Sequence, residues 1–209
     1  MATQRTVSRL LAIAFALFGV GLLAPRAEAR IGESKATIER RLLRTGGVVY
    51  RDDAIEAKRR KGMPYREFLP LIPHENVFVK LYFKTAEERE PSSSELSAKG
   101  MPDGWDLHVV FVGGKSAVEV YHRSQPMSEY EANELLARQS GDSFWKRVKG
   151  SEKKPSAFGY EMVRDDGALR ARRLGGDKLL IVSAELDKQL AQNREQSLIE
   201  EAPVSVRGF

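Results

Sequence analysis

The chain has no cysteine among its 209 residues, so it can form no disulfide and carry no lipid on an N-terminal cysteine. Histidine is scarce as well. His74, His108 and His122 do not form a clustered set of the three or four ligands that a metal ion needs. Burial of apolar side chains must therefore hold the fold together, and we predict neither a metal site nor a cofactor.

Long apolar runs are absent except for one near the N-terminus. The uncharged run over residues 10–24 follows Arg5 and Arg9, and small residues at Ala27 and Ala29 precede Arg30. This three-part pattern is typical of a secretory signal peptide. A retained membrane anchor is the alternative, but a spanning helix needs about 20 apolar residues and this run is shorter. We expect residues 1–29 to be removed before Arg30, leaving an exported chain, periplasmic or extracellular, with no stable membrane span.

A strong excess of one charge is also missing. The formal net charge is +5, and the predicted signal peptide removes three arginines and one glutamate, which leaves about +3. The basic stretches at 58–61 and 146–154 lack the interleaved aromatic residues of nucleic-acid-binding surfaces. Nucleic acid is therefore not an expected partner.

The stretch "VVFVGGKSAVEVYH" at 109–122 resembles the end of a phosphate-binding loop. That motif needs a glycine where Val109 stands and a helix after the serine, whereas the residues after Ser116 alternate as in a strand. We therefore predict a two-residue β-hairpin turn with Val112 opposite Lys115, and no nucleotide site. This register gives an apolar, buried face and a mixed, solvated face: the first holds Leu107, Val109, Phe111, Val118 and Val120, and the second pairs His108 with Glu119 and Asp106 with Tyr121.

Periodicity and capping residues predict an α+β fold in which helices are followed by antiparallel strands. Helices are expected at 34–44, 53–61, 128–139 and 184–199, and strands at 47–52, 77–84, 143–149, 157–164, 169–174 and 178–186, besides the hairpin. The two halves resemble each other, each with a helix, about four strands and a Gly-Gly turn. The domain at 30–200 is thus either one unit or two helix-plus-sheet repeats, 30–124 and 125–192, with a loose tail at 201–209.

An exported chain that begins Gly-Glu-Ser before a short helix and continues "GGVVYRDD" into an antiparallel sheet resembles the SmpA/OmlA and beta-lactamase-inhibitor-protein-like group. The resemblance covers most of residues 31–190 in outline. It implies a scaffolding, inhibitory or assembly protein rather than an enzyme. No functional residue is carried over from that group.

Catalytic motifs are incomplete throughout, so no catalytic residue is predicted.

The candidate binding residues are Arg170 and Arg172. With Gly175-Gly176 as a two-residue turn, both project outward beside Ile181 and Leu179, where they suit an anionic partner. The alternative is that they are ordinary solvated residues of the sheet.

These observations leave two alternative functions. The first is a non-catalytic module that binds another envelope or secreted protein through a sheet face. The second is a hydrolase-like exported enzyme whose site is assembled from distant residues.

Strand alternation places Trp105 inside the core near His122 and leaves Trp145 partly exposed, with Phe144 facing inward.

Overall fold

The computed structural model describes residues 31–98, 100–152 and 154–201. The predicted signal peptide with its cleavage point before Arg30, and the predicted tail from residue 202 onward, lie outside the described residues. Within the described chain, no helix combines the length and apolar character that crossing a membrane requires.

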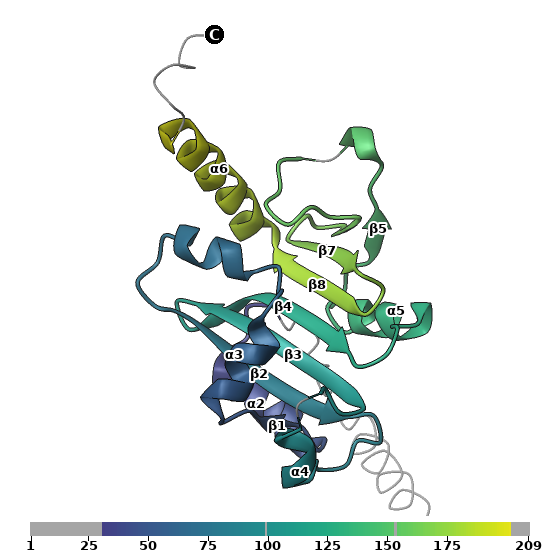
Figure 1. Cartoon of the computed structure of the whole chain (residues 1–209). Helices are drawn as coiled ribbons and strands as arrows, with labels where there is room; N and C mark the ends of the chain where they lie inside the picture. Colours follow the sequence, from purple (N-terminus) through teal and green to yellow (C-terminus); the bar gives the residue numbers. More distant parts are fainter. Residues whose placement is uncertain (1–30, 99, 153, 202–209) are drawn as a thin grey trace, which may run out of the picture.

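A single eight-stranded antiparallel sheet forms the centre of the molecule (Figure 1). Its strands are β1 (Val48–Val49), β2 (Val77–Thr85), β3 (Gly104–Val112), β4 (Lys115–Arg123), β5 (Trp145–Arg147), β6 (Met162–Arg164), β7 (Leu169–Leu174) and β8 (Lys178–Ser183). They lie in the order β1-β2-β3-β4-β8-β7-β6-β5. The predicted α+β fold with antiparallel strands is confirmed.

The strand order divides into two equivalent halves. Helix α2 (Lys35–Arg44) precedes β1–β4, and helix α5 (Glu129–Ala137) precedes β5–β8. The halves join where their last strands, β4 and β8, pair with each other. The order of one helix before four strands thus occurs twice, and all eight strands form one continuous sheet. The remaining elements are α3 (Asp53–Arg60), the 3-10 helix η1 (Arg66–Leu71), α4 (Ser93–Leu96), the 3-10 turn η2 (Gly150–Glu152) and α6 (Ala184–Glu201).

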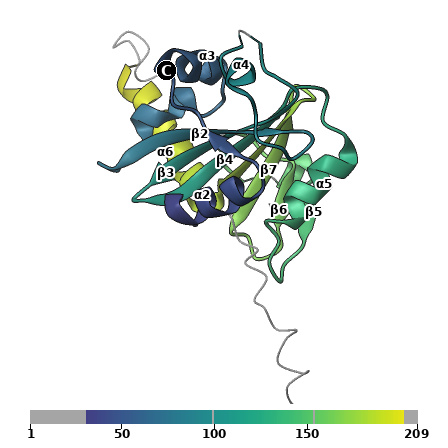
Figure 2. The ribbon, with the colours of Figure 1, turned by 90° about the horizontal axis from the view of Figure 1, so that it is seen from below.

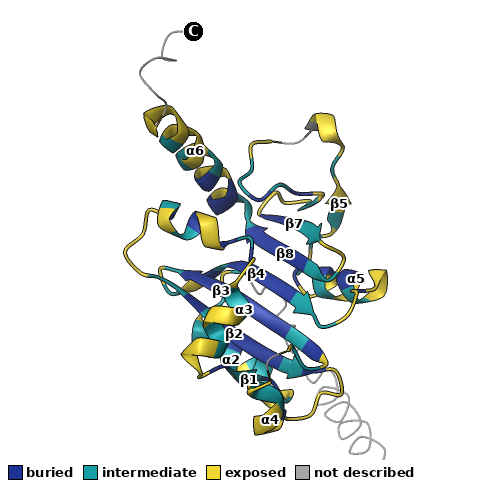
Figure 3. Ribbon diagram, in the orientation of Figure 1, coloured by how far each residue is buried: buried dark blue, intermediate teal, exposed yellow. Residues whose placement is uncertain are grey.

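Both faces of the sheet are covered (Figure 2). On the α3–α6 face, side chains from the α3–η1 region and from the start of α6 pack on the sheet, among them Tyr65, Phe68 and Leu190. On the α2–α5 face the covering side chains come from the two equivalent helices, and include Ile38 and Leu136. The central strands β3, β4 and β8 are consequently buried along most of their length (Figure 3).

Local sequence signals fixed the helix starts. Ser34 caps α2 by accepting from the Thr37 N–H, and Asp52 caps α3 in the same way. The predicted capping box of α5 is present, because Ser128 and Glu131 each accept a backbone N–H from the other. These caps need only residues three apart, which explains why they could be predicted.

The predicted Gly-Gly turn between β3 and β4 is confirmed, but the predicted register of the two strands is wrong beyond it. Gly113 and Gly114 have φ of 58° and 79°, and Val112 lies opposite Lys115. The register then shifts by one residue at Ala117, a β-bulge that the alternation of the sequence does not reveal.

The bulge changes which side chains share a face. Val110 lies opposite Val118 and His108 opposite Val120, so these four side chains share the α3–α6 face. The pairs predicted to be solvated are instead buried: Asp106, His108 and Glu119 are each 0 % exposed. Helices on both faces, together with the bulge, account for the error.

The hairpin turn carries a test of its assignment. Gly114→Ala should destabilise the fold by about 1–2 kcal/mol, because alanine must adopt the left-handed conformation that glycine holds there. Open space surrounds the position where the new Cβ would lie, so sterics add nothing. Lys115→Ala should change stability by less than about 0.5 kcal/mol, since its side chain is exposed. Urea unfolding of both variants measures the difference; equal losses would contradict the turn assignment.

Candidate functional site

The structure buries Arg170, which was expected to be an exposed binding residue. The turn between β7 and β8 has three residues rather than two, because Leu174 pairs with Lys178. Arg170 therefore lies opposite Val182 on the α3–α6 face and is 5 % exposed. Its Nη1 donates to Asp187 Oδ2 at 2.6 Å, and its guanidinium lies 4.4 Å from the Tyr160 ring centre. The expectation that it projects into solvent is wrong.

Arg172 is half-buried, whereas its side chain was expected to project into solvent. Its Nη1 donates to the Phe158 carbonyl at 2.9 Å, while Arg170 also donates to the Pro155 carbonyl at 2.8 Å. Both arginines thus fix the loop that crosses the edge of the α3–α6 face. The two residues lie on the same face of β7, and both donate to this loop.

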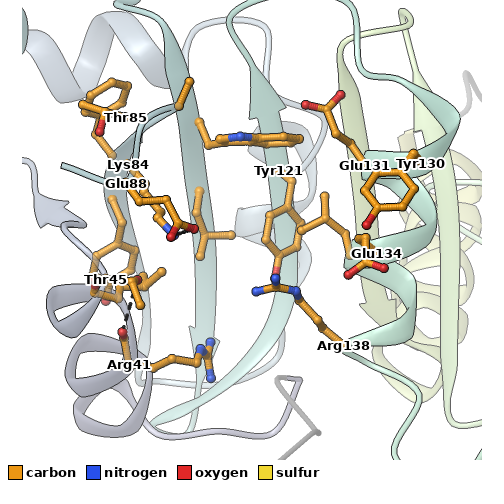
Figure 4. A pocket seen from close by; sticks show the side chains of 17 residues that line it. Arg41, Thr45, Lys84, Thr85, Glu88, Tyr121, Tyr130, Glu131, Glu134 and Arg138 are labelled. Carbon is orange, nitrogen blue, oxygen red and sulfur yellow. Dashed lines mark hydrogen bonds and ion pairs between the residues drawn. The ribbon is translucent and has the colours of Figure 1, made fainter.

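A groove of about 640 Å³ opens on the α2–α5 face, between the two equivalent helices (Figure 4). Arg41 and Thr45 line it from α2, and Tyr130, Glu134 and Arg138 line it from α5 or its C-cap. Strands β2, β3 and β4 form its floor, with the side chains of Tyr82, Trp105, Leu107 and Tyr121. Its volume falls within the range usual for ligand sites in proteins.

Trp105 is placed differently from the prediction. It lies on the expected face but is only half-buried, and it faces Arg123 rather than His122. The Arg123 guanidinium stands 5.2 Å from the centre of its ring, while Arg123 Nη1 donates to Asp103 Oδ1 at 2.7 Å. Trp105 is therefore a fixed aromatic surface at the groove and not a core residue.

The second tryptophan also differs in part. Trp145 is half-buried, as expected, and its indole N–H donates to the Leu136 carbonyl at 2.8 Å. Phe144, which was expected to face inward, is 57 % exposed. Strand β5 is short and lies at the sheet edge, so its alternation does not report burial reliably.

The groove's charged residues are mostly paired. Lys84 Nζ contacts Glu88 Oε1 at 2.7 Å, and Arg123 Nε contacts Glu131 Oε1 at 3.2 Å. The hydrogen bond from Lys84 lowers the pKa of Glu88. Burial favours a higher pKa for Glu131, but hydrogen bonds from Ser128 and Arg123 outweigh it and lower the value.

The lining offers few groups suited to acid–base catalysis. Among the described residues that line the groove there is no His, Ser, Cys or Asp, and its carboxylates are those of Glu88, Glu131 and Glu134. The pKa of Glu88 and that of Glu131 both move away from neutrality, the opposite of what acid–base catalysis needs. The arrangement can hold a ligand on an aromatic floor.

The perturbed titratable residues lie on the other side of the sheet. On the α3–α6 face, Tyr50 Oη donates to Asp106 Oδ1 at 2.9 Å, and the hydroxyl of Tyr65 lies 2.9 Å from His108 Nδ1. Burial raises the pKa of Asp106 to about 6 and lowers that of His108 to about 3. Arg59 stands 3.8 Å from Asp106 Oδ2.

Perturbed pKa values often mark active sites, so this cluster competes with the groove as the candidate. However, Asp106 and His108 have no exposed surface, and the α3–η1 region covers them. A substrate would have to displace that cover. Within the described chain, no three His, Cys, Asp or Glu side chains are grouped to hold a metal ion. The groove is the better candidate because it is open, while burial is the largest cause of the pKa shifts in the cluster.

Comparisons with known proteins give no relative: no family model, no curated protein and no solved structure matches the chain. The resemblance to the SmpA/OmlA and beta-lactamase-inhibitor-protein-like group stays a prediction. The groove must therefore be interpreted from its own chemistry.

Sequence reasoning missed the groove residues, although one signal was available. Tyr130, Glu134 and Arg138 recur every four residues, which places them on one side of α5. Arg41 and Thr45 have the same spacing on α2. An aromatic residue in such a polar stripe, 74 % exposed at Tyr130, is the feature that could have drawn attention to this surface.

Proposed function

We propose that the chain is an exported, non-catalytic module that binds a segment of another envelope or secreted protein in the groove between α2 and α5. The observation that carries the proposal is the half-buried Trp105, which Arg123 holds at the floor of an open groove. Rigid aromatic side chains at a concave surface are the usual anchors of protein interfaces.

The polarity of the groove supports a protein segment as the ligand. Its floor is aromatic and aliphatic, whereas its walls carry three basic and three acidic side chains. An apolar centre with a mixed polar rim is the composition of protein–protein interfaces. The alternative function, an exported hydrolase, needs a nucleophile held beside its base, whereas two of the three carboxylates of the groove, those of Glu88 and Glu131, are held in ion pairs with basic residues.

A photo-crosslinking amino acid at Tyr130 tests the proposal in the native host. Its side chain is exposed and lines the groove, so we expect one discrete crosslinked product in the exported fraction. Leu198 is the matched control, because it is 61 % exposed but lies on α6, away from the groove. Trp105→Ala should remove the product. The same band from both positions, or no band from Tyr130 despite full incorporation, contradicts the proposal.

A further inference from the structure

We infer that the groove selects a peptide segment with a single acidic residue, whose carboxylate lies between Arg41 and Arg138 and whose neighbouring apolar side chain packs on the aromatic floor. The inference rests on the proposed function and adds the chemistry of the ligand. It follows from how the charges of the lining are distributed.

Two arginines enter the groove from opposite walls. Arg41 projects from α2 and Arg138 from the end of α5, and in Figure 4 their side chains point toward each other across the groove. Guanidinium groups are always charged and present several N–H donors in a planar fork. A carboxylate has only acceptors, so it matches two such forks.

Two nitrogen atoms of the Arg41 guanidinium group have no hydrogen-bond acceptor among the described residues. Its Nη1 is bound to Glu33, but no described group accepts from its Nε or Nη2, although both atoms are buried. Buried donors without an acceptor are unfavourable, and a rotation of the Arg41 side chain, which is 24 % exposed, that brings these donors to the oxygen atoms of a ligand removes that penalty. The unused donors on the groove wall thus point to an acceptor-rich ligand.

Arg138 is exposed, and its guanidinium makes no hydrogen bond or ion pair in the described part of the chain, although its charge helps to lower the pKa of Glu88. By contrast, Lys84 and Glu131 are each paired with a neighbouring charge. A ligand therefore does not have to break an ion pair in order to reach Arg138.

Glu134 limits the charge of the ligand. It stands one helical turn before Arg138 and also lines the groove, so its carboxylate repels a second acidic group placed along α5. Trp105, Tyr121 and Tyr130 also line the groove and favour large apolar side chains. The expected ligand therefore has one Asp or Glu beside an aromatic or aliphatic residue, and not an acidic run.

Selection of a phage-displayed library of random heptapeptides on the purified exported protein tests this inference. We expect enriched sequences with one acidic residue next to Trp, Phe or Leu. Affinity of these peptides for Arg138→Glu should fall about tenfold or more, because an attraction becomes a repulsion. Arg40→Glu is the matched control: Arg40 is exposed on α2, does not line the groove and undergoes the same change of charge. Its affinity should stay at the wild-type value.

The outcomes separate this inference from the proposed function. Peptides that lose binding with Trp105→Ala but lack an acidic residue, or that bind Arg138→Glu and Arg41→Gln like the wild type, overturn the inference and leave the groove as the binding site. Enriched peptides indifferent to Trp105→Ala, or no enrichment at all, overturn both. Circular dichroism of each variant confirms that the fold is intact.

Discussion

Arg170→Met should destabilise the folded chain by about 3–5 kcal/mol, because it leaves the carboxylate of Asp187 buried without its counter-charge. Asp187 is 0 % exposed and accepts hydrogen bonds from the hydroxyl of Ser156 at 2.6 Å and the Ala157 N–H at 2.9 Å. Methionine preserves most of the apolar stem, so the loss reports the charge and not a cavity. Urea unfolding at neutral pH measures the change.

Arg172→Met is the matched control. Arg172 is half-buried in the same strand and donates to a single backbone carbonyl, that of Phe158. Its replacement should cost about 1 kcal/mol, the net contribution of an ordinary hydrogen bond. If the two variants lose stability equally, Arg170 does not hold a buried ion pair and the three-residue β7–β8 turn is wrong.

His108→Gln should make the protein less sensitive to acid. Burial lowers the pKa of His108 from 6.5 to about 3, so between these pH values the unfolded chain holds a proton on this imidazole that the folded chain lacks. Stability is therefore lost as the pH falls through this window. Glutamine does not titrate, and its amide can still bond to Tyr65. The difference in unfolding free energy between wild type and variant should shift in favour of the variant by about 2–3 kcal/mol from pH 7 to pH 4.5.

Asp106→Asn supplies a control of opposite sign. Burial raises the pKa of Asp106 from 3.8 to about 6, so between these values the folded chain holds the extra proton and gains stability as the pH falls. Asparagine removes that gain. The wild type should improve relative to this variant by about 2 kcal/mol over the same interval. Two shifts of the same sign would show that at least one of the two residues is not buried as described.

The sequence predicted those parts of the fold that depend on a few adjacent residues. The Gly113-Gly114 turn and the capping box of Ser128 and Glu131 are local, since each is decided by backbone conformation or hydrogen bonds within four residues. The number and type of most elements follow from the same signals.

Errors arose where distant parts of the chain decide the environment. The bulge at Ala117 and the third residue in the β7–β8 turn each shift a register by one, which alternation alone does not reveal. A prediction of burial from alternation also assumes that one face of the sheet is exposed to solvent. Here α3, η1 and α6 cover the face that carries Asp106 and Arg170, so polar residues that suggest solvent are buried in pairs.

The candidate site could not be predicted from the sequence for a related reason. The groove combines Arg41 of the first half with Arg138 of the second, residues separated by nearly half of the chain. Their proximity depends on the pairing of β4 with β8. A single sequence shows which residues share a helix face but not which two helices stand next to each other.

The mirrored strand order leaves the two walls of the groove alike in backbone and different in side chains. Helices α2 and α5 each precede four strands, and β4 and β8 pair where the two sets of strands meet. Two identical chains paired about a two-fold axis would present the same residues on both walls. In this single chain the wall with Arg41 differs from the wall with Tyr130 and Arg138, so a peptide bound there would meet different groups in its two directions.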